Sequence, residues 1–196
     1  MANWAYTDYV VQGGKEALQR VYDAIKKHPV QKDSSEDWEG NVLHALNIDF
    51  ENMKVRDNVP YMRGFIQQET VELKDDVLCF SAEEAWGATD FADVLNAKLN
   101  DIDVLYYVQE EGGCIYATND KDGEFFPDRY HVDACIDGNY HYEYFVNEEE
   151  LYEWLKRISD GKITDGESVD KFNEEFENSD DYDSNFIRIH EIQIVD

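Results

Sequence analysis

Residues 4–25 read WAYTDYVVQGGKEALQRVYDAI and contain the signals of a strand, a turn and a helix in succession. Residues 4–11 are rich in aromatic and β-branched side chains, which favour a strand. The apolar face of this strand changes sides near Asp8, where we expect a bulge. Gly13 and Gly14 end the strand. An apolar residue then recurs every three or four positions, which predicts one apolar stripe on a helix. The stripe consists of Leu18, Val21, Tyr22 and Ile25.

The elements that follow complete a regular order. They are a weaker helix capped by Ser34 or Ser35, a strand over residues 63–73, a strand over residues 77–80, a helix capped by Thr89 or Asp90, and a strand over residues 102–108. With the weaker helix counted as part of a linker, the order is strand, helix, strand, strand, helix, strand. This order, with two helices on one face of an antiparallel sheet, is that of the ferredoxin-like split β-α-β fold. We therefore expect an α+β protein.

The second half of the chain is expected to enlarge this core within a single domain, residues 1–196. Asn147 and Glu150 form a capping pair, and the apolar stripe that follows predicts another helix. A terminal strand over residues 186–195 then returns to the sheet. The expected parts are a ferredoxin-like core (1–112), hairpins that extend its sheet (113–146), and an acidic helical segment with the terminal strand (147–196).

The charge of the chain limits its partners. It has 45 acidic and 17 basic side chains, for a formal net charge of −28 over 196 residues. A field this negative repels nucleic-acid backbones and anionic membranes, and it attracts basic partners or cations. The chain is nevertheless 42% hydrophobic, with 13 tyrosines and 10 phenylalanines, whereas disordered acidic chains are poor in aromatic residues. The charge therefore lies on a folded protein that binds neither nucleic acid directly nor a membrane.

Neither cysteine spacing nor a motif indicates an enzyme. Cys79, Cys114 and Cys135 are far apart and form no disulfide or zinc pattern, so we expect reduced thiols in a cytoplasmic protein. No apolar run approaches the roughly 20 residues that span a bilayer. No nucleophile elbow or phosphate-binding loop is present. We assign no catalytic residue and no cofactor.

Two segments raise the question of a metal site. Asn119 to Gly123 resembles the centre of an EF-hand loop, but Thr118 and Arg129 occupy positions where that loop needs acidic ligands. A hairpin turn is the preferred interpretation. The second segment is a strand that places three possible ligands on one face. They are His131, Asp133 and Cys135.

The register of the hairpin that contains this strand decides whether the second site exists. A three-residue loop, Asp137 to Asn139, would bring His141 and Glu143 onto the same face. A two-residue loop at Gly138 and Asn139 would bring tyrosines there instead, and two-residue loops are commoner. We therefore assign no metal site.

Several short motifs resemble one known family. They are Met1-Ala2-Asn3-Trp4, the glycine before the first helix, Ala85-Trp86, and the segment YYVQEEGG at residues 106–113. Together they resemble the plasmid- and phage-borne YubB family, whose members carry a ferredoxin-like domain. Ala5 stands where that family often has cysteine, so the chain is similar to a divergent member. The resemblance implies the fold and a mobile-element setting, and it supplies no catalytic residues.

We expect a non-enzymatic interaction protein whose acidic surface binds a basic protein partner. In its sharper form, the hypothesis is a nucleic-acid mimic, whose carboxylates stand in rows at a density comparable to the charge of duplex DNA, about one per 1.7 Å of axis. The candidate residues for these rows are Glu149, Glu150, Glu153, Glu174, Glu177 and Asp181.

Two alternatives remain open. A small-ligand-binding module or an enzyme would have a pocket near Trp86, Glu110 and Glu111, which lie beside the motifs of the resemblance. A concave apolar pocket with converging polar groups would favour that function. Otherwise the acidic surface serves only solubility, as a net charge far from zero does in many proteins.

Overall fold

The chain forms two compact units rather than the single domain expected from the sequence. The computed structural model describes residues 3–27, 38–177 and 184–195. Unit 1 comprises residues 1–121 and 194–196, and unit 2 comprises residues 122–193. Both units combine helices with β-strands, so the α+β class is confirmed. Within the described ranges, none of the helices has the length and apolar character needed to cross a bilayer.

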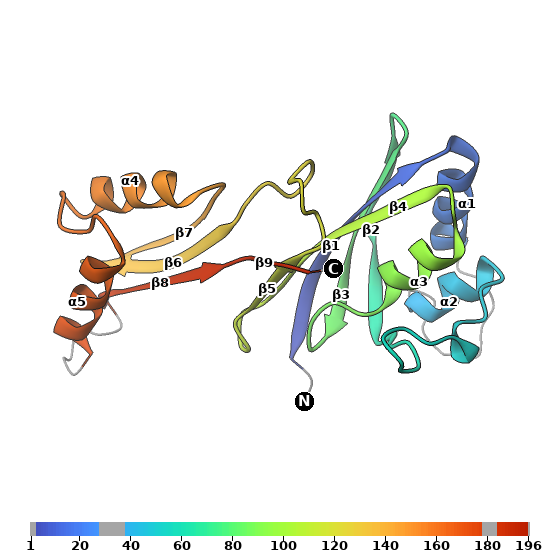
Figure 1. Ribbon diagram of the computed structural model, residues 1–196, viewed down its shortest axis with the longest axis horizontal. Coiled ribbons are helices and arrows are strands. Elements are labelled where there is room, and N and C mark those ends of the chain that lie inside the picture. The colour runs from blue at the N-terminus through green and yellow to red at the C-terminus, as the bar shows by residue number, and fades with distance from the viewer. Residues whose placement is uncertain (1–2, 28–37, 178–183, 196) are drawn as a thin grey trace. The chain divides into compact units, whose positions relative to one another are not determined.

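The sheet of unit 1 has the strand order β2-β3-β1-β4-β5-β9 (Figure 1). Its strands are β1 (Trp4–Gly13), β2 (Gly64–Lys74), β3 (Val77–Ala85), β4 (Ile102–Glu110), β5 (Ile115–Thr118) and β9 (Gln193–Ile194). β1 lies between β3 and β4 and pairs antiparallel with both. β2 pairs antiparallel with β3, and β5 with β4. The first strand of the chain is therefore an interior strand of the sheet.

β1 alternates between a buried face and an open face from Trp4 to Tyr9, and Val10, on the face of Asp8, is also buried. Its register with β3 is continuous from Trp4 to Gln12, so the bulge predicted near Asp8 is wrong. Asp8 lies on the open face, where its carboxylate accepts a hydrogen bond from Ser81 Oγ at 2.6 Å. Simple alternation accounts for the pattern, because one face of an antiparallel sheet can remain polar. The residues on the buried face are Ala5, Thr7, Tyr9 and Val11.

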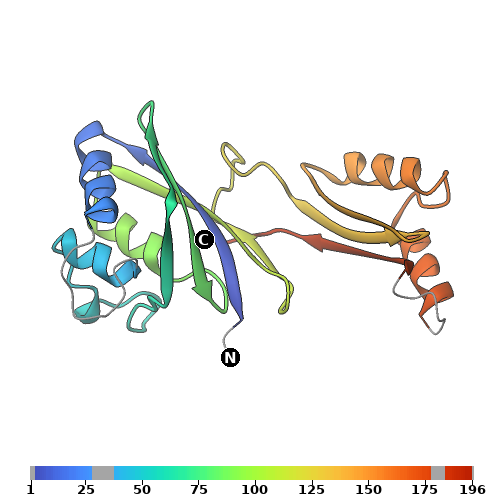
Figure 2. The ribbon, with the colours of Figure 1, turned by 180° about the vertical axis from the view of Figure 1, so that it is seen from behind.

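The described helices of unit 1 cover one face of this sheet (Figures 1 and 2). They are α1 (Lys15–Lys26), α2 (Glu39–Ala45) and α3 (Phe91–Lys98), with a short 3-10 helix, η1 (Phe50–Asn52), after α2. Gly13 has a φ of 151°, and a Cβ there would overlap the carbonyl oxygen of Asp101. Glycine is therefore required where β1 turns into α1. Ser34 and Ser35, the predicted caps of the second helix, lie outside the described residues.

Unit 2 has a sheet of its own, with the strand order β7-β6-β8. Its strands are β6 (Tyr130–Ile136), β7 (Asn139–Phe145) and β8 (Phe186–Glu191), and both pairings are antiparallel. The prediction that the 129–146 hairpin extends the first sheet is therefore wrong. β6 uses one edge for β7 and the other for β8, so β6 has no edge left for a strand of the first sheet. Of the predicted terminal strand, only the short β9 joins the sheet of unit 1.

Two helices complete the core of unit 2. They are α4 (Glu148–Ile158) and α5 (Gly166–Phe176). Asn147 caps α4 as predicted, because its side-chain oxygen accepts a hydrogen bond from Glu150 N at 2.9 Å. The buried cluster consists of Val132, Ala134, Ile136, Phe145, Leu151, Leu155, Ile163, Val169 and Ile187. It shares no residue with the buried cluster of unit 1, so each unit has its own hydrophobic core.

Candidate functional site

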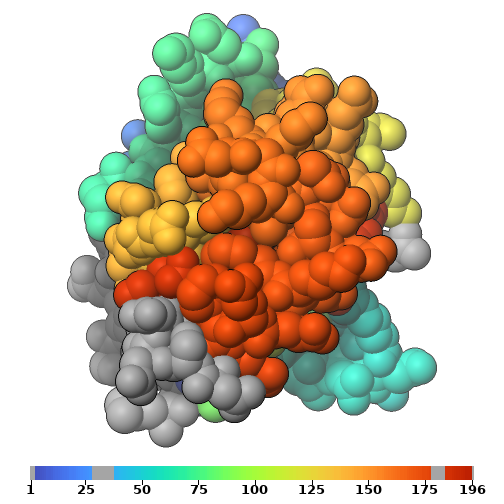
Figure 3. Space-filling view, turned by 90° about the vertical axis from the view of Figure 1, so that its left-hand side faces the viewer, coloured from blue at the N-terminus to red at the C-terminus, as the bar shows by residue number. Residues whose placement is uncertain are grey.

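The exposed face of α5 carries a row of carboxylates. Glu167, Asp170, Glu174 and Glu177 follow one another at intervals of three, four and three residues, and all four are exposed. Residues with this spacing lie on one face of a helix. We call these four residues the α5 acid row. Figure 3 shows α4 and α5, in orange, forming a continuous surface of unit 2. Glu174 and Glu177, two of the predicted binding residues, therefore belong to one row.

An open hollow of about 410 Å³ lies between the α5 acid row and β8. It is lined by Asp170, Asn173, Glu174, Glu177, Phe186, Ile187 and Arg188. The Asn173 side chain donates to the carbonyl oxygen of Ile187 and accepts from the Ile187 backbone N–H, each at 2.8 Å. These two bonds fix α5 on β8. The hollow therefore has one wall on a helix and one on a strand, and both walls are anchored.

The strand wall of the hollow contains an aromatic ring and a cation. The Cζ atom of Arg188 lies 4.4 Å from the centre of the Phe186 ring. Arg188 Nη1 also lies 3.2 Å from Asp133 Oδ2. A guanidinium group thus stacks on this ring within the chain itself. Carboxylates beside an aromatic surface are groups that bind arginine and lysine side chains.

One acid beside the row and one acid within it have local structural roles. Asp165 caps α5 by accepting a hydrogen bond from Ser168 N at 2.9 Å, and its bonds with Ser168 lower the pKa of the Asp165 carboxyl. Glu167 accepts a hydrogen bond from Lys171 Nζ at 2.6 Å. Three acids of the row form no hydrogen bond or ion pair with any residue that the structure describes. They are Asp170, Glu174 and Glu177.

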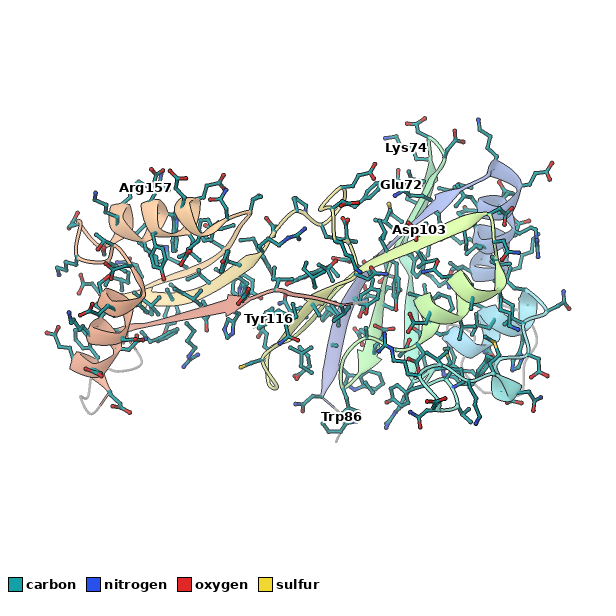
Figure 4. All side chains as sticks on the ribbon, viewed as in Figure 1. Glu72, Lys74, Trp86, Asp103, Tyr116 and Arg157 are labelled. Carbon is teal, nitrogen blue, oxygen red and sulfur yellow. The ribbon has the colours of Figure 1, made fainter. Side chains whose placement is uncertain are left out.

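α4 does not form a comparable acidic row. Its first half contains Glu148, Glu149, Glu150 and Glu153, and its last turn contains Lys156 and Arg157. Figure 4 shows Arg157 on this helix. Acids at the N-terminus and bases at the C-terminus of a helix both stabilise it through the helix dipole. Glu149 and Glu150, in the first turn of α4, therefore have a structural explanation, whereas Glu153 lies beyond that turn. Asp181, the last predicted residue, lies outside the described residues.

Glu110 has a structural role at the end of β4. Its two carboxylate oxygens accept hydrogen bonds from Gly112 N at 2.9 Å and from Gly113 N at 2.6 Å. The side chain is buried. Glu111, its neighbour, is exposed. The carboxylate of Glu110 therefore holds the turn that follows β4.

Trp86 lies near this turn, as the alternative function requires. The Trp86 backbone N–H donates to the carbonyl oxygen of Asn3 at 2.9 Å. The side chain of Asn3 also approaches the turn, because a Cβ on Gly112 would lie 3.0 Å from its Nδ2 atom. Figure 4 shows Trp86 at the opposite end of the sheet from Lys74. The Trp86 ring is 55% exposed, so it faces solvent and does not line an enclosed pocket.

Unit 1 contains a buried polar cluster that sequence reasoning missed. Its members are Thr7, Tyr9, Glu39, Glu84 and Thr89, and each is at most 6% exposed. Glu84 accepts hydrogen bonds from Tyr9 Oη at 2.7 Å, from Thr89 N at 3.2 Å and from Thr7 Oγ1. Thr89 Oγ1 lies 2.7 Å from Glu39 Oε2 and 2.8 Å from Glu84 Oε1. The cluster joins β1, β3, α2 and the loop before α3.

Burial changes the acid–base behaviour of this cluster. It raises the pKa of the Glu39 carboxyl well above 4.5, and the negative charge of Glu84 raises it further. Burial also raises the pKa of the Tyr9 hydroxyl above its usual value of 10.0, with the charges of Glu84 and Glu39 adding to the effect. Both groups therefore favour their protonated forms.

One pattern in the sequence does indicate the position of Glu84. Leu78, Phe80 and Ala82 are buried on the core face of β3. Strict alternation continues that face to Glu84, so an acid is expected among core residues. Glu39 carries no comparable signal, because it lies at the start of the weakest predicted helix. Glu84, its partner in the cluster, is 45 positions away in the sequence.

The 129–146 hairpin has the register that separates the possible metal ligands. Ile136 pairs with Asn139, so the two-residue loop is Asp137 and Gly138, one position before the predicted one. The His131 face of β6 receives Tyr140, Tyr142 and Tyr144, while His141 and Glu143 lie on the other face. The rings of Tyr142 and His131 have their centres 4.1 Å apart. Among the described residues, no group of three or more His, Cys, Asp or Glu side chains could hold a metal ion.

Comparisons with known proteins identify no family for this chain. No family model matches it, and neither a curated protein nor a solved structure shows a significant match.

Proposed function

We propose that this protein is a non-enzymatic interaction protein that binds a basic protein partner at the α5 acid row. The observation that carries the proposal is the hollow beside the row, which Asp170, Glu174 and Glu177 line together. A partner arginine or lysine would place its charge among the three carboxylates. The partner is therefore a protein with a basic surface.

The position of these acids on the helix supports a role in binding. Glu174 lies in the last turn of α5 and Glu177 is its C-cap, and no basic residue occupies that turn. Carboxylates at the C-terminus of a helix are unfavourable, because the helix dipole is negative there. Residues that break a local rule without a local benefit are candidates for function. Solubility alone does not require acids at these positions.

The spacing of the row supports the sharper proposal of a nucleic-acid mimic. The four carboxylates span ten residues of helix, or about 15 Å at 1.5 Å per residue. One strand of duplex DNA carries a charge every 3.4 Å of axis, or roughly four over the same length. We propose that the row takes the place of a short run of phosphates in a basic groove.

Unit 1 supports a more specific proposal for the fold and its setting. The order β2-β3-β1-β4, with α1 between β1 and β2 and α3 between β3 and β4, favours a ferredoxin-like core. We propose that the chain is a divergent YubB-like protein of a mobile element. The three cysteines are free thiols, which supports a cytoplasmic location because disulfides are rare there.

Neutralising the hollow tests the proposal. The variant Asp170→Asn/Glu174→Gln/Glu177→Gln should bind an oligo-arginine peptide roughly tenfold more weakly than the parent protein at low salt. Each exposed ion pair contributes about 0.5 kcal/mol, and 1.4 kcal/mol corresponds to a factor of ten. Fluorescence anisotropy of the labelled peptide measures the dissociation constants.

The matched control removes the same number of charges from unit 1. Glu16→Gln/Glu69→Gln/Glu72→Gln changes exposed acids on α1 and β2, and it should change the affinity by no more than about twofold, since salt screens distant charges. Equal losses in the two variants would contradict a localised site. In a host lysate, the parent should capture a basic nucleic-acid-binding protein at low salt. Duplex DNA should compete for that protein if the row acts as a mimic.

A further inference from the structure

In the buried cluster of unit 1, two carboxyl groups meet at a single hydroxyl group. Thr89 Oγ1 lies within hydrogen-bond distance of both Glu39 Oε2 and Glu84 Oε1. A threonine hydroxyl has only one proton to donate. It can therefore donate to one of the carboxyl groups, and the other must donate to the hydroxyl oxygen. The geometry requires a proton on one of the two acids.

The distribution of donors identifies the acid that carries the proton. Glu84 accepts from Tyr9 Oη, from Thr7 Oγ1 and from Thr89 N. Within the described part of the chain, Glu39 has no such set of donors, and its Oε1 atom is buried without a hydrogen-bond partner. Donors stabilise a carboxylate, whereas a buried carboxyl without donors favours its neutral form. Glu39 is therefore the proton carrier.

Among the residues that the structure describes, none supplies a cation that compensates the pair. β2 contributes the backbone of Gly64, where a Cβ would lie 2.5 Å from the Glu39 carboxyl carbon. Tyr9 on β1 interacts electrostatically with both acids, and Tyr106 on β4 interacts with Glu84 and also with Asp90 and Asp93, around the start of α3. Arg56 reaches this region but lies 3.3 Å from the Asp93 carboxylate. Ionisation of both acids would thus leave two negative charges buried together.

We propose that Glu39 and Glu84 share one proton through Thr89, and that this proton holds α2 and the loop before α3 on the sheet. The stability of unit 1 should therefore fall as the pH rises. Protonation of this pair makes the stability of the core depend on pH. It is independent of the acidic surface of unit 2.

The direction of the pH effect follows from the raised pKa of Glu39. A carboxyl whose pKa is higher in the folded state contributes stability that is complete below its unfolded pKa of about 4.5. That stability is lost as the pH rises toward the folded pKa. Within this window, one proton changes the unfolding equilibrium constant tenfold per pH unit. Unit 1 should therefore be more stable at mildly acidic pH than at alkaline pH.

Hydrogen exchange of the full chain tests the proposal. Protection factors of the β1 amides are measured from about pH 5.5, above the isoelectric point of about 4.2, to about pH 8.5. In the parent protein they should fall by up to tenfold per pH unit more than in Glu39→Gln, whose neutral amide cannot ionise. Glu16→Gln removes an exposed acid from α1, and it should retain the slope of the parent.

Two results would overturn the proposal. The first is an equal pH slope in the parent and in Glu39→Gln. The second is a rise in β1 protection on adding Ca²⁺ or Mg²⁺ at alkaline pH that Glu39→Gln abolishes, because the pair would then hold a cation instead of a proton. If Glu39→Gln does not fold, infrared spectroscopy of the parent decides the matter. It should show the C=O stretch of a protonated carboxyl at neutral pH, and its absence would contradict the shared proton.

Discussion

Replacing Phe91 by alanine should destabilise unit 1 by about 3 to 5 kcal/mol, the usual cost of removing a fully buried phenylalanine. Phe91 is 0% exposed. Its ring packs edge-on against Tyr9 and Phe80, with ring centres 5.9 and 6.2 Å away. The substitution leaves a cavity between α3 and the centre of the sheet. The neighbouring rings belong to different strands, so they cannot close it without moving the backbone.

Hydrogen exchange resolved along the chain measures this effect. Amides of β1, β3 and β4 should lose protection in Phe91→Ala, while those of β6 should not, because the two buried clusters share no residue. Tyr61→Ala is a matched control, since it removes an aromatic side chain that is 41% exposed and should cost far less. Equal loss of protection in β1 and β6 would contradict the division into two cores.

Replacing Leu155 by alanine should reduce amide protection in unit 2 and leave unit 1 protected. Leu155 is 0% exposed and belongs to the buried cluster of unit 2. A buried leucine replaced by alanine costs about 2 to 5 kcal/mol. The loss should appear in the β6 and β8 amides and leave β1 protected. Because α5 is fixed on β8 by Asn173, this variant should also lose affinity for a basic partner.

A control on the same helix separates packing from charge. Arg157→Ala removes an exposed side chain from α4, and surface substitutions of this kind usually change stability by about 0.5 kcal/mol or less. It should leave both the exchange pattern and the binding in place. If Leu155→Ala unfolds unit 2 without weakening binding, the α5 acid row is not the binding site.

The order of elements in unit 1 could be predicted because each element has a local signal. The glycines at the end of β1, the short gap between the predicted strands 63–73 and 77–80, and the apolar stripe of α1 are each recognised within a few residues. Asp75 and Asp76 have positive φ values of 48° and 69°, which suits a two-residue hairpin turn. The predicted bulge near Asp8 is wrong, because the pairing of β1 with β3 is continuous through this residue.

The separation of unit 2 could not be predicted from local signals. A hairpin such as β6–β7 can join any sheet with a free edge. What decides its place is β8, whose residue His190 pairs with His131 across 59 positions of sequence. The loop length was predicted, but its position was displaced by one residue. Because the period of a strand is two, the conclusion that tyrosines face His131 is unaffected.

The candidate site was predicted in part. Glu174 and Glu177 were selected because the C-terminal segment is rich in acids, and the spacing with Asp170 follows from helical geometry. The wall formed by Phe186 and Arg188 could not be predicted, because it depends on how α5 packs against β8. Glu110 was selected for its position beside a resemblance motif, and its role in a turn becomes evident only from its bonds to two backbone amides.

Locating a bound cationic probe on the full chain tests whether a basic partner binds at the α5 acid row. Amide ¹H–¹⁵N NMR spectra are recorded while an oligo-arginine peptide is added at low salt. Binding at the row predicts saturable shifts that are largest in α5 and β8, around Asp170, Glu174 and Phe186, and that are absent from the Asp170→Asn/Glu174→Gln/Glu177→Gln variant. Shifts that are largest on α4 or around Trp86, or that spread evenly over all exposed acids, would contradict it.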